Sequence, residues 1–194
     1  SFPTRRSSDL FQDGYGILVY GDDFDVQIHN NVIRSSPRGG IGVSFSNVGD
    51  EGRAIIDGNR IFENGTSGSD DGAGIHIGGP ASPRAEVVIT NNIVADNAGA
   101  AGVESTDGDL TITIEHNTIV GNRVGVAGLY GPRRGRVRNN IVAGNRRIRD
   151  DLLADAGYDP MGAVSFEYNL IGDPAFVGPA SNLHGDPLLI SGPG

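Results

Sequence analysis

The sequence predicts an all-β protein whose short parallel strands wind into a stacked coil, and two observations lead to this prediction. The first is a six-residue pattern that recurs six times in the 194 residues: an apolar residue, two spacers, an asparagine, one spacer and a β-branched residue. The second is a composition of 31 Gly with no Trp, which is typical of many short strands joined by tight turns. Repeats of this kind indicate a solenoid, because one unit alone cannot bury its apolar face.

The asparagine is the fixed point of each copy. The six copies lie at 28–33, 56–61, 89–94, 114–119, 137–142 and 166–171, and their asparagines are separated by 28, 33, 25, 23 and 29 residues. Because Asn tolerates left-handed backbone geometry, we expect it to turn the chain. We also expect stacked asparagines to hydrogen-bond to one another and to neighbouring backbone, in one ladder formed by Asn31, Asn59, Asn92, Asn117, Asn140 and Asn169.

Each unit has room for three short strands and three turns. One strand precedes the ladder Asn, and its apolar residues lie five and three positions before that Asn, so one face is buried and the other is wet. A second strand follows the Asn. The third is a β-prone run that opens with a glycine, at Gly16, Gly40, Gly74, Gly102 and Gly125. Stacked units would place equivalent strands ~4.8 Å apart.

Over roughly residues 16–171 this repeat resembles the right-handed parallel β-helix repeat of pectate-lyase-like proteins. The resemblance implies a right-handed single-stranded parallel β-helix of about six to seven coils. It implies little about function, since this fold hosts lyases, hydrolases, epimerases and adhesins. We expect the β-helix to occupy 11–172, after a probable adapter-derived, non-native stretch at 1–10 and before a truncated, irregular segment at 173–194.

In pectate-lyase-like proteins the glycine-initiated strands and their loops form the substrate groove. Aligning these strands by their inward residues gives an outward column of Leu18, Gly42, His76, Glu104 and Ala127. His76 and Glu104 would then lie on adjacent coils, where a carboxylate can orient an imidazole as general acid or base. They are the candidate catalytic residues; the simpler alternative is an incidental histidine on a wet face.

Two loops add candidate binding residues. Asp70 and Asp71 lie in a Gly/Ser loop before His76 and suit Ca²⁺, the one cofactor that the sequence suggests. Arg84, and the loop that holds Tyr130, Arg133 and Arg134, could bind an acidic sugar by stacking and paired hydrogen bonds. For both loops the alternative is an ordinary solvated turn.

Charge and composition limit the partners. The net charge is −9 and all 15 basic residues are Arg, which argues against nucleic acid as a partner. No apolar run approaches the ~20 residues that span a bilayer. Residues 169–174 are echoed at 182–187, and this closing segment resembles the end of β-helix passenger domains in secreted bacterial surface proteins. We therefore expect an extracellular or cell-surface protein, and a monomer.

Two functions stay open. The first is a non-catalytic polysaccharide-binding or surface structural module. The second is a polysaccharide lyase or related carbohydrate-active enzyme that acts on acidic polysaccharide. An enzyme requires His76, Glu104 and an arginine to converge on one sugar position, whereas a structural module requires only a flat face with these side chains in solvent.

Overall fold

The computed structural model describes residues 14–46, 51–65, 72–79, 84–106, 110–129, 134–145, 164–172, 181–185 and 187. Within them the chain forms 18 β-strands and no helix, and every strand pairing is parallel. The all-β parallel coil that the sequence predicts is confirmed. The predicted tail at 1–10 lies outside the described residues.

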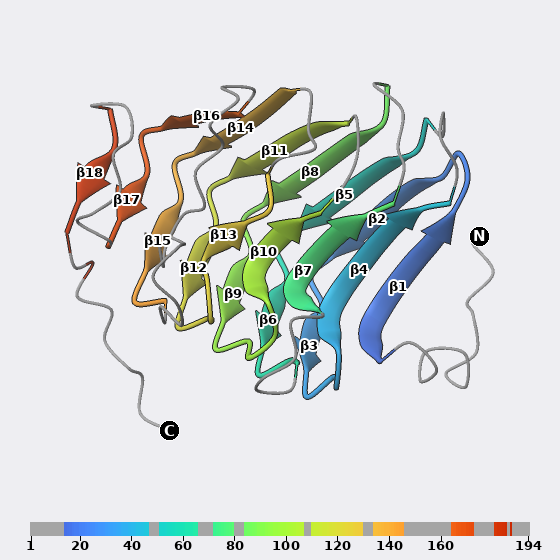
Figure 1. The fold of residues 1–194 in the computed structure, drawn as a ribbon, viewed down its shortest axis with the longest axis horizontal. Helices are drawn as coiled ribbons and strands as arrows, with labels where there is room; N and C mark the ends of the chain where they lie inside the picture. Colours follow the sequence, from blue (N-terminus) through green and yellow to red (C-terminus); the bar gives the residue numbers. More distant parts are fainter. Residues whose placement is uncertain are drawn as a thin grey trace.

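The strands form three sheets, and one strand from each sheet makes one coil (Figure 1). Sheet A consists of β1 (Tyr15–Gly21), β4 (Gly39–Phe45), β7 (Ala73–Gly78), β10 (Ala101–Ser105) and β13 (Val126–Ala127). Sheet B consists of β2 (Asp25–His29), β5 (Arg53–Asp57), β8 (Glu86–Thr90), β11 (Thr111–Glu115), β14 (Arg134–Arg138) and β16 (Val164–Glu167). Sheet C consists of β3 (Val32–Arg34), β6 (Arg60–Phe62), β9 (Ile93–Ala95), β12 (Thr118–Val120), β15 (Ile141–Ala143), β17 (Leu170–Ile171) and β18 (Leu183–His184).

The inward residues of all three sheets fill one core. Most are β-branched or other aliphatic side chains, which pack well on a pleated surface. Ile41, Ile75 and Val103 are register partners in sheet A, and Ile56, Ile89 and Ile114 are partners in sheet B; all six are fully buried. The core therefore extends along the coil axis as a stack of like side chains.

The predicted asparagine ladder is present and has one member more than expected. In the middle of the ladder, the backbone N and Nδ2 of Asn92 donate to Oδ1 of Asn117 at 2.9 and 3.0 Å, and Nδ2 also donates to the Ile56 carbonyl. The same pattern runs from Asn31 to Asn169 and continues to Asn182. With β18, Asn182 adds a rung beyond residue 172, inside the segment expected to be irregular.

A second ladder lies at the turn from sheet C to sheet A. It is formed by Asn64, Asn97, Asn122 and Asn145, which repeat the same bonds: Nδ2 of Asn97 donates to Oδ1 of Asn122 at 2.9 Å. The sequence shows these asparagines five residues after the first set, but the ladder was not predicted.

Left-handed backbone geometry lies one residue before the ladder asparagines, not at them as the sequence analysis expected. At the first ladder it falls on Asn30, Gly58, Asn91, His116, Asn139 and Tyr168, with φ between 55° and 66°. At the second it falls on Glu63, Asp96, Gly121 and Gly144, and Ser35 has the same geometry before Ser36, whose backbone N donates to Oδ1 of Asn64. The left-handed residue turns the chain, and the asparagine that follows can then direct its amide into the coil.

The glycines that open the sheet A strands are required by crowding. A Cβ at Gly74 would lie 2.6 Å from Cγ1 of Val94 and 2.8 Å from Nδ2 of Asn97. A Cβ at Gly40 would be crowded in the same way by the side chains of Ile61 and Asn64. Each of these glycines therefore packs against two side chains, the β-branched residue that ends the six-residue pattern and an asparagine of the second ladder. No larger residue fits there.

Candidate functional site

The outward column of sheet A has the register that the sequence predicts. Leu18 pairs with Gly42, Gly42 with His76, His76 with Glu104, and Glu104 with Ala127. His76 and Glu104 therefore lie side by side on β7 and β10, on the same face of the coil.

The two side chains are in direct contact. Nδ1 of His76 lies 3.1 Å from Oε2 of Glu104, and the side chains are 23 % and 15 % exposed. In the tautomer that donates Nδ1–H to the carboxylate, Nε2 carries the lone pair. A Cβ at position 78 would lie 2.8 Å from this Nε2. Because residue 78 is a glycine, no side chain from this position covers Nε2. A fixed imidazole with a free nitrogen can accept a proton or a hydrogen bond from a ligand.

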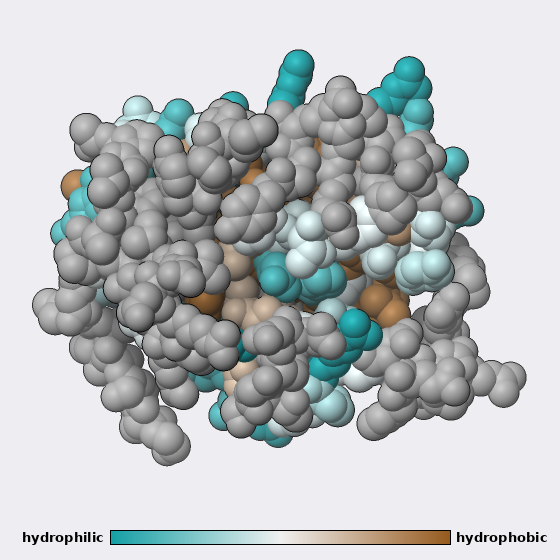
Figure 2. Space-filling view, viewed as in Figure 1, coloured by the Kyte–Doolittle hydropathy of each residue, from teal (hydrophilic) through white to brown (hydrophobic). Residues whose placement is uncertain are grey.

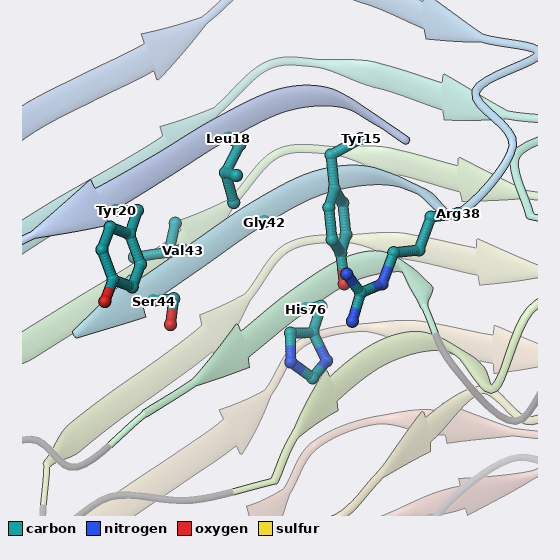
Figure 3. Close-up of a pocket in the computed structure, with 8 residues that line it drawn as sticks. All are labelled: Tyr15, Leu18, Tyr20, Arg38, Gly42, Val43, Ser44 and His76. Atoms are coloured by element: carbon teal, nitrogen blue, oxygen red, sulfur yellow. The ribbon is translucent and has the colours of Figure 1, made fainter. Parts of the chain in front are cut away.

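A pocket of about 370 Å³ borders His76 on the side of β1 and β4 (Figure 3). This volume lies within the ~300–1,000 Å³ of small-ligand pockets. Its lining combines two tyrosines, aliphatic surface, one cation and two hydrogen-bonding groups: Tyr15, Leu18, Tyr20, Arg38, Gly42, Val43, Ser44 and His76. The space-filling view of the same side shows hydrophilic and hydrophobic surface next to each other there (Figure 2).

Tyr15 is the centre of this pocket wall. Its ring centroid lies 6.2 Å from that of His76, and Cζ of Arg38 lies 5.4 Å from the Tyr15 ring centroid. A Cβ at Gly39 would lie 2.6 Å from Cε1 of Tyr15, so the ring occupies space that a side chain on β4 would need. The Tyr15 ring thus contacts both the guanidinium group of Arg38 and the imidazole ring of His76.

The two described arginines among the predicted binding residues lie elsewhere. Nη1 of Arg84 donates to Oε1 of Glu51 at 2.6 Å, and both side chains are at least half exposed. Arg134 is not in a loop, as expected, but is the first residue of β14 in sheet B, with Thr111 as its register partner. Neither has a recorded contact with His76 or Glu104.

The remaining predicted residues, Asp70, Asp71, Tyr130 and Arg133, lie outside the described residues. In the part of the chain that the structure describes, no three or more His, Cys, Asp or Glu side chains form a group that could hold a metal ion. The Ca²⁺ hypothesis therefore stays a prediction.

Sequence reasoning missed Tyr15, Tyr20, Arg38 and Ser44. Tyr20 and Ser44 lie two positions after Leu18 and Gly42, and are register partners. Extending the outward column by one period of two would have found both. Arg38 directly precedes the glycines that open β4, and only the cation–ring distance links it to Tyr15.

The comparisons with known proteins agree with this architecture. The family model described as "right handed beta helix region" matches residues 6–146, which is more than half of the chain. The protein therefore belongs to the right-handed β-helix family, and the predicted right-handed parallel β-helix is confirmed. No curated protein and no solved structure matched. The described part of the chain has no helix that could span a bilayer.

Proposed function

We propose that this protein is a polysaccharide-binding β-helix module whose binding surface is the outer face of sheet A. The observation that carries the proposal is the pocket beside His76, where the exposed ring of Tyr20 lies in one lining with Arg38 and Ser44, and the buried Tyr15 forms the wall. Aromatic faces pack against apolar faces of a ligand, while guanidinium and hydroxyl groups bind its polar substituents. A sugar unit, above all an acidic one, has both kinds of surface.

The deciding measurement is binding of the full chain to a panel of neutral and acidic polysaccharides by affinity electrophoresis and calorimetry. Tyr20 lines the pocket and is 60 % exposed, so Tyr20→Ala should fold normally and weaken binding roughly three- to tenfold. Arg38→Gln should act selectively on acidic polysaccharides. Tyr168→Ala is the matched control, because Tyr168 is 64 % exposed and lies at the turn between sheets B and C. Equal loss in Tyr20→Ala and Tyr168→Ala would exclude the pocket as the binding surface.

The second candidate is a carbohydrate-active enzyme of the polysaccharide lyase type, and the contact between His76 and Glu104 favours it. His76 would act as the general base through Nε2, and Glu104 would orient the ring. Arg38 approaches this chemistry through Tyr15, whereas the described arginines predicted from the sequence, Arg84 and Arg134, lie elsewhere. Incubation with uronate polysaccharides, with and without Ca²⁺, tests this: a lyase raises absorbance at the unsaturated-uronate band, and His76→Ala abolishes the rise. If no substrate produces this rise in absorbance, the lyase candidate fails and the polysaccharide-binding module remains the proposed function.

The proposed location is extracellular or at the cell surface, and the proposed state is a monomer. The location follows from the resemblance of residues 169–187 to the closing segment of secreted bacterial surface proteins, and from the place where polysaccharides are met. Sedimentation of the purified chain and fractionation of the producing cells test the two statements separately.

A further inference from the structure

Sheet B carries a second cluster of ligand-binding groups, on a different sheet from the pocket. Arg134, Arg136 and Arg138 alternate along β14, so all three side chains leave the same outer face of the sheet. Among the residues that the structure describes, one of the three, Arg138, is held by a close ion pair.

Arg138 is neutralised within the sheet. Its Nε and Nη2 donate to Oε1 and Oε2 of Glu115 at 2.7 and 3.1 Å, and Glu167 is its register partner on the other side. The hydrogen bonding of Arg138 to the Glu115 carboxylate is the main cause that raises the pKa of Arg138, and the charges of Glu115 and Glu167 add to it. Arg138 therefore serves the coil itself.

Arg134 and Arg136 have no comparable partner among the described residues. The nearest carboxylate oxygen to Arg136 is Oε1 of Glu115 at 3.9 Å, and both oxygens of this carboxylate are already bound to Arg138. Arg134 is exposed and makes no ion pair with any described residue. The arginine on the earlier strands of this sheet, Arg53, is different: its Nε donates to Oε2 of Glu86 at 2.7 Å.

The neighbours of these two arginines are small and hydroxylated. Thr111 is the register partner of Arg134, and Thr113 and Ser165 flank Arg136 on β11 and β16. The short side chains on both sides of Arg136, and that of Thr111 beside Arg134, leave the guanidinium groups accessible, and their hydroxyls add hydrogen-bond donors and acceptors. The Cα atoms of the two arginines are ~6.6 Å apart along the strand, so two anionic groups of one extended polymer can be met together.

We propose that the outer face of β14 is a binding site for an acidic polysaccharide, with Arg134 and Arg136 pairing with successive carboxylate or sulfate groups of the chain. Nucleic acid fits less well, because its affinity comes from many clustered phosphate contacts, whereas this face offers two such arginines in a protein of net charge −9. The site is independent of the sheet A pocket, and it stands whether or not that pocket binds sugar.

The test measures binding of polygalacturonate, dextran sulfate and neutral dextran to the full chain, at low and at high salt. Polygalacturonate and dextran sulfate distinguish carboxylate from sulfate as the preferred group. Arg134→Gln/Arg136→Gln should weaken binding of the preferred polyanion roughly tenfold or more, because two charge-assisted contacts are lost. High salt should weaken wild-type binding more than that of the double variant.

Three controls make the result decisive. Arg53→Gln removes one positive charge from the same face, half of what the Gln pair removes, and from a residue already paired with Glu86, so binding should change less than about twofold. Arg134→Lys/Arg136→Lys keeps the charge and should retain most of the affinity. The Gln pair is also measured in a Tyr20→Ala background, where the proposed sheet A site is weakened: the same fold loss there separates the β14 site from the proposed function.

The proposal is overturned if the Gln pair binds as wild type does, if Arg53→Gln loses as much affinity, or if the Lys pair loses as much as the Gln pair. Equal binding of neutral dextran, or binding of a single-stranded oligonucleotide as tight as that of the acidic polysaccharides, would overturn the ligand class.

Discussion

The interior of the coil and the outer face of sheet A are built from the same strands, yet they follow opposite rules. Facing inward, register partners are nearly identical: Ile41, Ile75, Val103 and Val126 lie in one row. Facing outward, one residue further along each strand, the row changes at every step from Gly42 to His76, Glu104 and Ala127. Repetition serves the fold, because each coil must fit the next. Where repetition stops, the fold imposes no choice, and chemistry can be placed there.

Substitution of a ladder asparagine should give the largest effect on the interior side. Asn117→Ala removes the acceptor of the Asn92 backbone N and Nδ2, and the donor to Oδ1 of Asn140 and to the Ile89 carbonyl. Nδ2 of Asn92 and Oδ1 of Asn140 each keep one bond, but the buried backbone N of Asn92 and the Ile89 carbonyl lose these partners. We therefore expect the free energy of unfolding to fall by about 3 kcal/mol. Urea denaturation measures this directly.

The matched control is Asn139→Gly, one coil away. Asn139 is exposed, and its φ of 55° suits glycine. The change should cost less than about 1 kcal/mol. If Asn117→Ala and Asn139→Gly cost the same, the ladder does not stabilise the coil.

Filling the space at a sheet A glycine should give the next largest effect. In Gly74→Ala the new methyl group meets Cγ1 of Val94 at 2.6 Å and the Gly102 carbonyl oxygen at 2.7 Å, and overpacking of this kind costs about 1–3 kcal/mol. Gly144→Asn is the control, since Gly144 has a φ of 65° and nothing within 4 Å of its Cβ position. Asparagine tolerates this conformation, so little change is expected. A thermal shift that is equal for both variants would contradict crowding as the reason for the glycine.

The contrast between the two faces also explains what the sequence could predict. The inward rule repeats six times, so the pattern around Asn31 to Asn169 was enough to predict the strands, the register and the first ladder. The register in turn predicts that His76 lies next to Glu104, as the structure shows. The second ladder was missed because its asparagines were seen only as strand ends.

The pocket could not be predicted in the same way, since its walls do not repeat. Tyr15 reaches His76 across β4 only because Gly39 and Gly42 leave room for its ring. Such an arrangement depends on the size of several side chains on three strands. Arg134 shows the opposite error: a Tyr-Gly-Pro-Arg-Arg sequence favoured a loop, but parallel pairing with Thr111 begins at Arg134.

The turn between sheets B and C offers a smaller, stabilising change. Tyr168 has a φ of 56° and is 64 % exposed, so its side chain adds strain without burial. We expect Tyr168→Gly to raise the free energy of unfolding by about 1 kcal/mol, because a left-handed non-glycine residue costs about that much. Asn169, its buried neighbour, must keep its ladder bonds in the variant; increased hydrogen exchange at Asn169 would show that the turn itself had changed.

The pair His76 and Glu104 should have the smallest effect on stability, and this would separate the two faces most sharply. The pair is partly exposed and lies outside the core, so a double-mutant cycle of His76→Ala and Glu104→Ala should give a coupling energy of only about 0.5 kcal/mol. The same variants should reduce binding or turnover at the sheet A pocket. A coupling energy above about 2 kcal/mol with unchanged ligand binding would instead make the pair a structural cross-link between β7 and β10. The departure from repetition at this position would then serve the fold after all.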